Sequence, residues 1–362
     1  MQVILDRRAL HAIPELELTL PKTAAYLKES LKPLKCTLTF PMGDAICAFF
    51  DFGKEDAIAF RADMDALPIP EETGLSFAST HPGIMHACGH DGHMATLLEL
   101  ARRLDKKDTL PHNVLLIFQP GEESPGGAKP LCETGILEKH NVKAVFGLHL
   151  WPGLEKGVMH TREGGLMSRG SELNVDVYGK SSHIGNAAAG IDSTAAAVEF
   201  YRQMRAAEAA LPDDIFRLLN FGKFESGTVR NAISAHAHME GSLRAFDDET
   251  FNGLRDRLFE IKSDVEIRFG CRIEIWMSEG YPAVINTPEM VAQIQKIAPV
   301  KLLEKPSMTS EDFAEYQQLV PGVFFFLGTG DTAALHATTF NFDEEILLKG
   351  ADFFEKLAEN FQ

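Results

Sequence analysis

The chain has 362 residues, of which 45% are hydrophobic, and its formal net charge is −17. This length predicts two domains with sizeable cores, and the acidic balance without a block of Lys and Arg argues against binding to nucleic acid or anionic membranes. No apolar run is long enough to span a bilayer, and charges stand where a signal peptide needs an apolar centre, so we expect a cytoplasmic protein.

The first 166 residues alternate between predicted helices, strands and polar turns. Two helices are expected in residues 5–33, interrupted at Pro14 and Pro21. Apolar runs then predict strands at 45–52, 57–60, 113–118 and 144–148, and helical spacing predicts helices at 94–104 and 128–137. Acids or histidines follow several of these strands. This alternation is typical of a doubly wound sheet, which carries its chemistry at the carboxyl ends of its strands.

The pattern changes after Leu166. Strands are expected at 171–178, 217–224, 235–246 and 272–277, and helices at 192–208 and 248–269. Their order, β-α-β-β-α-β, matches the ferredoxin-like unit. From Gly280 the first pattern resumes with a helix at 288–297, an apolar strand at 323–327 and a closing helix at 343–359.

These elements predict an α/β protein of two domains. Residues 1–169 and 279–362 would form a catalytic domain around an open, mostly parallel sheet with helices on both faces. Residues 170–278 would form an inserted ferredoxin-like α+β domain.

Residues His86-Ala-Cys-Gly-His-Asp-Gly-His93 concentrate side chains that bind metals. Cys88 and His90 are two positions apart, and the intervening glycine lets a tight turn aim both at one point. The five cysteines of the chain are odd in number and widely spread, which indicates reduced thiols, and only Cys88 has such neighbours. The alternative is that these residues lie on a surface loop and bind no metal, but similar residues recur elsewhere in the chain.

Four places present ligand types after strands or at the start of a helix: Cys88 with His90, Glu122 with Glu123, His149, and His336. One metal ion needs three or four protein ligands, so this mixture of thiolate, imidazole and carboxylate better suits two adjacent ions. The donors favour Zn(II), Mn(II), Co(II) or Ni(II). Asp63 and Asp65 follow a strand and could belong to the site or cap a turn. Glu122 and Glu123 could instead cap the helix expected at 128.

The two consecutive glutamates suggest a division of labour. Neighbours on an extended segment point to different sides, so one could bind metal while the other moves protons. A metal ion lowers the pKa of water to about 7, within reach of a carboxylate base. This chemistry predicts hydrolysis of an amide.

Taken together, these segments resemble the amidohydrolase branch of the two-metal aminoacylase and carboxypeptidase superfamily. That branch includes N-acyl-amino-acid amidohydrolases, hippurate hydrolase, plant auxin-conjugate hydrolases and N-acetyldiaminopimelate deacetylase. The resemblance runs from about Arg7 to Asp343. It is carried by Arg61-Ala-Asp-Met-Asp-Ala-Leu-Pro68, the 86–93 stretch, Gln119-Pro-Gly-Glu-Glu123, Gly147-Leu-His149, Gly179-Lys-Ser-Ser-His183, Gly227-Thr-Val-Arg-Asn231, Ser310-Glu-Asp-Phe313 and Leu335-His336.

The resemblance implies a role for each matching residue. The implied metal ligands of two divalent transition-metal ions are Cys88, His90, Glu123, His149 and His336. Glu122 would be the general base and Asp65 the acid that orients a ligand. In the inserted domain, a lid that also carries dimer contacts, His183, Asn231 and Arg244 would bind the substrate, and Arg244 is suited to gripping its carboxylate. His183 would serve its own or the partner subunit's site.

The resemblance also implies a substrate and an assembly. We expect a hydrolase of small N-acyl amino acids that forms a homodimer or homotetramer through the inserted domain. An alternative is N-acetyldiaminopimelate deacetylase, which residues 72–81 and 308–313 resemble; dipeptide cleavage is a third possibility, and an inactive binding or scaffold protein is an alternative of another class. The chain departs from the family at Gly121, where Ala is usual, and after His183, where Ile184-Gly-Asn-Ala187 replaces a small residue and a nearby proline.

Overall fold

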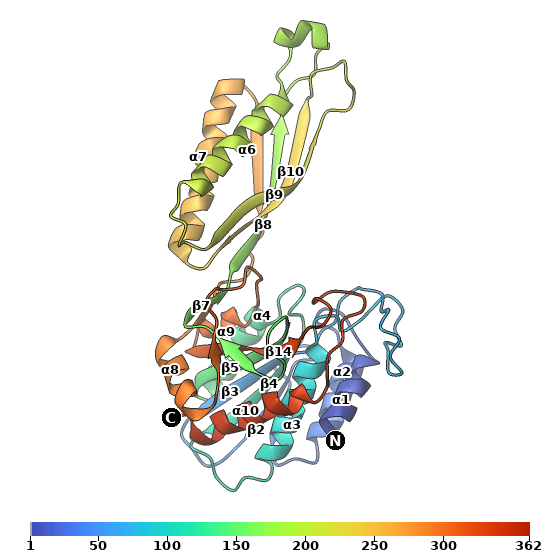
Figure 1. Cartoon of the computed structure of the whole chain (residues 1–362), viewed down its shortest axis with the longest axis vertical. Helices are drawn as coiled ribbons and strands as arrows, with labels where there is room; N and C mark the ends of the chain where they lie inside the picture. Colours follow the sequence, from blue (N-terminus) through green and yellow to red (C-terminus); the bar gives the residue numbers. More distant parts are fainter. Residues whose placement is uncertain (1) are drawn as a thin grey trace. The chain divides into compact units, whose positions relative to one another are not determined.

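The computed structural model describes residues 2–362, which divide into two compact units (Figure 1). Unit 1 contains the chain up to Leu166, Ile285–Lys305 and Asp312–Gln362, and unit 2 contains Met167–Val284 and Pro306–Glu311. The sequence prediction put the insertion at 170–278 and left 306–311 with the first domain. This segment groups with unit 2 because the Met308 carbonyl accepts hydrogen bonds from Ser168 and Arg244.

Unit 1 is built on an eight-stranded sheet in the order β1-β2-β4-β3-β5-β14-β6-β13. Its centre is parallel, since β3 pairs in parallel with β4 and β5, and β5 with β14. Every residue of β3 and β4 is buried, as expected where helices cover both faces of a parallel sheet. The mostly parallel sheet is confirmed. Its strands are β1 (Thr37–Thr39), β2 (Ile46–Phe50), β3 (Ala57–Asp63), β4 (Asn113–Gln119), β5 (Val142–Pro152), β6 (Met159–Thr161), β13 (Lys301–Leu302) and β14 (Gly322–Gly330).

Several helices of unit 1 differ from the prediction. The closing helix begins at Ile346 and not at 343, and the short helix at Ala314–Gln317 was not predicted. The helix expected to begin at residue 94 begins at His90, because Gly89 takes a left-handed φ of 86° and turns the chain into the helix. The helix expected at 128–137 is two short helices, divided at Gly135, which also has a positive φ. The helices are α1 (Gln2–His11), α2 (Pro21–Leu31), α3 (His90–Leu104), α4 (Ala128–Glu133), α5 (Ile136–Lys139), α8 (Pro288–Ile297), α9 (Ala314–Gln317) and α10 (Ile346–Asn360).

Unit 2 has the predicted ferredoxin-like order. Its sheet runs β11-β8-β10-β9 with every pair antiparallel, and the alternating burial along β8 shows that one face packs on helices. The elements are β8 (Arg169–Tyr178), the short helix η1 (Ile184–Ala189), α6 (Ser193–Ala209), β9 (Arg217–Ser226), β10 (His236–Ala245), α7 (Asp248–Phe269) and β11 (Arg272–Met277). Strands β7 (Gly164–Met167) and β12 (Val284–Asn286), where unit 2 begins and ends in the sequence, pair with each other.

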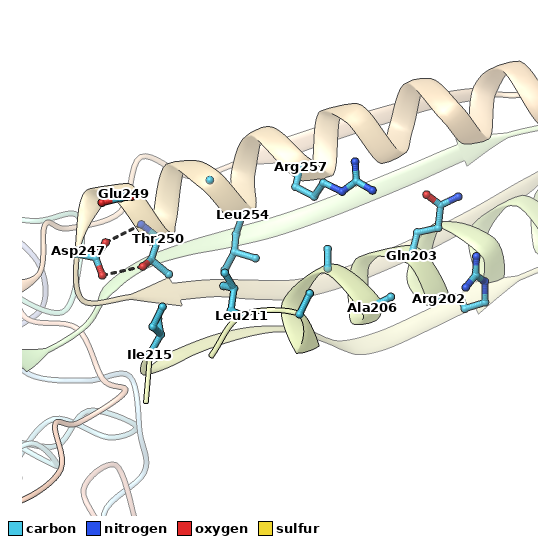
Figure 2. A pocket seen from close by; sticks show the side chains of 13 residues that line it. Arg202, Gln203, Ala206, Leu211, Ile215, Asp247, Glu249, Thr250, Leu254 and Arg257 are labelled. Carbon is cyan, nitrogen blue, oxygen red and sulfur yellow. Dashed lines mark hydrogen bonds between the residues drawn. The ribbon is translucent and has the colours of Figure 1, made fainter. Parts of the chain in front are cut away.

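A groove with a volume of about 990 Å³ lies between α6 and α7 of unit 2 (Figure 2). Small side chains such as Ala206 and Ala210 leave this space, and Leu211 and Leu254 give it an apolar wall. At one end Asp247 caps α7 by accepting hydrogen bonds from the Thr250 backbone and hydroxyl. None of the residues predicted for the catalytic site lines this groove. Among residues 2–362, every helix is too short or too polar to cross a membrane.

Candidate metal centre

The candidate site forms in unit 1 where the parallel strands end. Asp63 is the last residue of β3, Glu122 and Glu123 follow β4, and His149 lies near the end of β5. Because parallel strands end at the same edge of a sheet, these side chains converge, and the first turn of α3 adds His90. The geometry follows from the strand–turn–helix alternation in the sequence.

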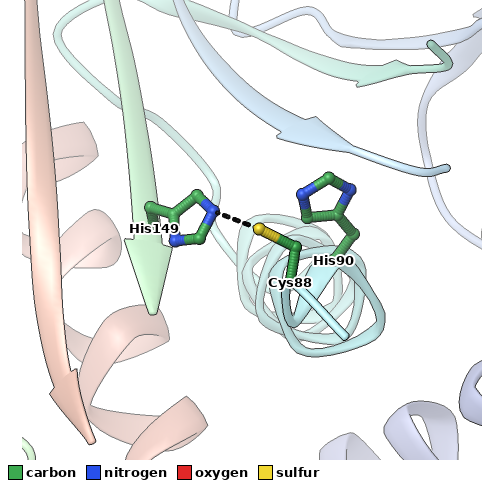
Figure 3. Close-up of side chains that lie close together, drawn as sticks. All are labelled: Cys88, His90 and His149. Atoms are coloured by element: carbon green, nitrogen blue, oxygen red, sulfur yellow. Dashed lines mark hydrogen bonds between the residues drawn. The ribbon is translucent and has the colours of Figure 1, made fainter. Parts of the chain in front are cut away.

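The five predicted ligands and Glu122 lie in one cluster. Cys88 Sγ is 3.3 Å from His149 Nε2 and 3.3 Å from His336 Nε2, so the sulfur belongs to two groups of donors. His336 Nε2 is 3.3 Å from Glu123 Oε1, and His90 Nε2 is 4.0 Å from a carboxylate oxygen of each glutamate. Figure 3 shows Cys88 and His90 at the start of α3, with the His149 ring reaching from β5 toward the sulfur.

Hydrogen bonds fix the orientation of two of these imidazole rings. His90 Nδ1 lies 2.8 Å from the Asp65 carbonyl oxygen, and His149 Nδ1 lies 2.7 Å from the Leu150 carbonyl oxygen. A carbonyl oxygen only accepts, so each Nδ1 carries the proton of the neutral ring and Nε2 offers a lone pair to the cluster. His90 Nε2 is buried and has no hydrogen-bond partner among residues 2–362. Nε2 is therefore the nitrogen that would bind a metal ion once the ring is neutral.

The donor set therefore fits a pair of metal ions. Structural zinc sites use four donors, whereas this cluster offers one thiolate, three imidazoles and two carboxylates, and Cys88 belongs to two of its groups. Two-metal hydrolases use such shared donors to hold neighbouring ions. Thiolate and imidazole favour transition metals over Mg(II) or Ca(II).

The electrostatics of the cluster also favour cations. Burial alone would lower the pKa of His90, but Asp63, Asp65 and Glu123 outweigh it and raise that pKa to about 10. Burial, with Glu123 and Glu122 nearby, raises the pKa of the Cys88 thiol well above its usual value. The protein alone thus keeps protons on groups that must lose them to bind a metal, so metal binding would be coupled to proton release.

Asp65 holds both glutamates through the backbone. Its carboxylate accepts hydrogen bonds from the backbone N–H of Glu122 at 2.8 Å and of Glu123 at 3.0 Å. The expected contact with an imidazole is made by the Asp65 carbonyl, whereas its carboxylate is 3.8 Å from His90 Nδ1. The prediction that the glutamates lie on an extended segment is wrong, because residues 122–125 form a turn that brings both carboxylates near His90.

Sequence reasoning gave His93 no role, but it supports the site. Its Nδ1 is 2.7 Å from Asp63 Oδ1, and its Nε2 accepts the Leu150 backbone N–H at 2.9 Å, which fixes β5 beside His149. The spacing of three from His90 was an available signal, since residues three apart share a helix face. Asp63 in turn accepts a hydrogen bond from buried Arg61 at 2.8 Å. Asp63 thus contacts His93 and Arg61 and lies 3.8 Å from His90 Nδ1.

The three predicted substrate-binding residues lie in unit 2 in two separate places. His183 and Asn231 are exposed and adjacent, because the Ile184 N–H donates to the Asn231 carbonyl at 2.9 Å. Arg244 lies near the other end of β10, where its Nη1 donates to the Met308 carbonyl at 2.6 Å. From His236, where β10 begins, to Arg244 the strand alone spans roughly 25 Å. Unit 2 therefore brings His183 to Asn231 and keeps Arg244 apart from them.

Comparisons with known proteins identify the family. The model of peptidase family M20/M25/M40 matches residues 59–360. A Staphylococcus epidermidis protein named uncharacterized hydrolase is 34% identical over 375 residues, covering 99% of this chain and 98% of that protein. These matches confirm the resemblance that the motifs indicated.

Two solved structures agree with this assignment. One is a protein of methicillin-resistant Staphylococcus aureus with the provisional name aminohydrolase, at a TM-score of 0.89 and 31% identity, covering 98% of this chain and 95% of the other. The second is a dinuclear metal-binding M20 peptidase from Bacillus subtilis, at a TM-score of 0.85 and 30% identity, covering 99% and 96%. The chain belongs to peptidase family M20/M25/M40 and is a hydrolase that acts on amide or peptide bonds.

Proposed function

We propose that this hydrolase removes the acyl group from small N-acyl amino acids and uses two divalent transition-metal ions, Zn(II), Mn(II), Co(II) or Ni(II). The observation that carries the proposal is the Glu122 carboxylate beside a cluster of five donors: Cys88, His90, Glu123, His149 and His336. A metal site with an adjacent carboxylate base suits the attack of water on an amide.

Each group has a defined part in the proposed reaction. The ions, when bound, polarise the amide carbonyl and lower the pKa of water. Glu122 takes a proton from the attacking water, whose oxygen adds to the carbonyl carbon. Glu122 then gives that proton to the amide nitrogen as the C–N bond breaks, which yields a carboxylic acid and a free amine, and the acid then loses its remaining proton to the amine or to solvent. Asp65 keeps Glu122 in place through its backbone N–H.

We further propose that unit 2 recognises the substrate. Arg244 would bind the α-carboxylate, and His183 and Asn231 would stabilise the developing oxyanion. Between the end of β10 that follows Asn231 and Arg244 near its other end, the strand alone spans roughly 25 Å, which is too long for one small molecule to contact all three residues in one chain. This favours a homodimer or homotetramer, assembled through unit 2, in which His183 of one subunit serves the site of another.

A substrate panel tests the proposal. The purified chain is incubated with N-acylated amino acids of varied acyl group and side chain, with each of the four metals, and the products are identified by mass spectrometry. We expect metal-dependent release of free amino acids, which a chelator abolishes. Failure of every N-acyl amino acid with every metal would reject the proposal, and it would support the inactive binding protein if the ligands still bind.

N-acetyldiaminopimelate deacetylase is the second candidate. Residues 72–81 resemble that subgroup, and this segment reaches the catalytic site because the Glu72 N–H donates to the Thr338 carbonyl at 2.8 Å, two residues after His336. Cleavage of acetyl-diaminopimelate alone in the same panel would favour this candidate over the broader amidohydrolase. Dipeptides in the panel separate both from a dipeptidase.

A further inference from the structure

Arg7 in α1 is buried although it is charged, with 1% of its surface exposed. Its guanidinium reaches two parts of the chain. Nε lies 2.8 Å from Asp91 Oδ2, Nη2 donates to Asn341 Oδ1 at 2.9 Å, and Nη1 donates to Glu344 Oε1 at 3.2 Å. The guanidinium is planar and its N–H groups point in fixed directions, forming a fork. A buried arginine that donates to several acceptors therefore fixes the relative positions of the elements that carry these acceptors.

The three hydrogen-bond partners of Arg7 lie on two sides of the candidate metal centre. Asp91 follows His90 in the first turn of α3. Asn341 and Glu344 belong to residues 335–344, here called the His336 segment, which contains no helix or strand and joins β14 to α10. Arg7 thus lies between the start of α3, which Cys88 precedes and His90 begins, and the segment with His336, although these are about 250 residues apart in sequence.

The His336 segment has few regular contacts of its own. His336 has a φ of 64°, which is unfavourable for a residue with a side chain, so surrounding contacts must hold it. One contact is the hydrogen bond from the His336 N–H to the Ala87 carbonyl at 2.9 Å. Another is Phe342, whose ring lies 4.3 Å from the Arg7 guanidinium and fills the space where Gly92 has no Cβ.

We propose that Arg7 is a positioning residue, which sets the His336 segment against the start of α3 so that His336 meets Cys88 and Glu123. It acts through Asn341, Glu344 and Phe342 on one side and Asp91 on the other. The metal-binding consequence rests on the proposed function, whereas the ordering of the segment does not. Loss of the Arg7 fork therefore loosens His336 before it disturbs Cys88, His90 or His149.

A general loss of stability is the competing explanation, and the chain offers a matched control. Arg102 Nη2 lies 2.6 Å from Asp6 Oδ2, so this ion pair also joins α1 to α3, which pack side by side (Figure 1). Arg102 is eleven residues beyond Asp91 in α3, about 16 Å along the helix. Replacing Arg102 weakens the same helix pair without touching the His336 segment.

The experiment compares Arg7→Lys and Asn341→Ala with the control Arg102→Met in the full chain. Lysine keeps a cation beside Asp91, which also accepts from His11 at 2.8 Å, but it cannot form the fork. Asn341→Ala removes one hydrogen bond between Arg7 and the His336 segment and keeps the contact of Arg7 with Asp91. This variant should therefore fold even if the lysine variant does not. Hydrogen–deuterium exchange of peptides covering 335–344 is measured in the metal-free protein, and metal binding is titrated by calorimetry.

We expect faster exchange of the His336 segment in both test variants and about 10–100-fold weaker binding of one metal ion, with the other unchanged. The control should leave both readouts as in the wild type. Unchanged exchange in a folded Arg7→Lys protein, or equal effects in the control, would overturn the proposal. If the wild type binds no metal, the proposed function fails, and the exchange result alone decides the role of Arg7.

Discussion

At the scale of single residues, the two neighbouring glutamates of the site have different contacts. Glu123 Oε1 faces His336 at 3.3 Å, and His336 and His90 hold the Glu123 pKa below its usual value against the effect of burial. Glu122 is 4.0 Å from His90 Nε2, and its backbone is fixed by Asp65. The motif predicted that one glutamate would bind metal and the other would move protons. This division stays a prediction, because both carboxylates lie 4.0 Å from His90 Nε2.

Replacing Glu122 by Gln should therefore separate catalysis from metal binding. We expect the catalytic rate to fall by about 10²–10⁴-fold, because the amide cannot take a proton, while the metal content stays that of the wild type. The checks are steady-state kinetics on the best substrate of the panel and elemental analysis of the purified variant. Glu133→Gln, at an exposed position in α4, is the control and should behave like the wild type. Full activity of Glu122→Gln would remove this residue from the mechanism.

At the scale of elements, local sequence determined some bounds and tertiary structure determined others. The prediction for α7 was correct at both ends, since Asp247 caps its start and Gly270, with a φ of 66°, ends it. The start of α3 was missed because residues 90–93 lack the apolar spacing of a helix. This first turn packs against Leu150 and Phe342 at Gly92, which has no side chain to give such a signal. The His336 segment has no helical or strand periodicity. The sequence could therefore predict that His336 is a metal ligand, but it could not predict the backbone conformation of the segment.

Gly121 affects the turn that follows β4 more than the sequence indicated. It has a φ of 74°, and a Cβ there would lie 2.6 Å from Leu18 Cδ2. Gly121→Ala should lower the free energy of unfolding by about 1–2 kcal/mol, because a side chain is disfavoured in this backbone region, and the strained turn should displace Glu122. Urea unfolding and kinetics measure both effects. Adding Leu18→Ala removes the clash, so the double variant should lose less stability than the sum of its parts; simple additivity would contradict a direct contact.

At the scale of the whole molecule, the site collects ligands from residues 88 to 336 of an acidic chain. The sequence predicted this convergence because strand ends meet at one edge of a sheet. It could not predict the supporting contacts of Arg7, since a single buried arginine leaves no periodic signal, whereas the spacing of His93 from His90 was a signal that could have been used. A net charge of −17 favours cations and repels an anionic amino-acid derivative, so the bound ions and Arg244 would have to supply the local positive charge.

This charge balance makes metal binding dependent on pH. The raised pKa values of His90, about 10, and of the Cys88 thiol mean that both carry protons in the metal-free protein at neutral pH. A metal must displace these protons, so its affinity and the activity should fall as the pH is lowered. Calorimetric titrations at pH 7.5 in buffers of different ionisation enthalpy should show release of about two protons per pair of ions. Binding without proton release would contradict the ligand roles of Cys88 and His90.

The most direct test of the central claim is a crystal structure of the chain grown with Mn(II) or Zn(II), with anomalous diffraction recorded at the metal edge. The account predicts two anomalous peaks about 3.5–4 Å apart. Both should contact Cys88 or its neighbours in the cluster of His90, Glu123, His149 and His336, with the Glu122 carboxylate beside them. A map without peaks at this cluster, or with metal bound only elsewhere on the chain, would contradict the account.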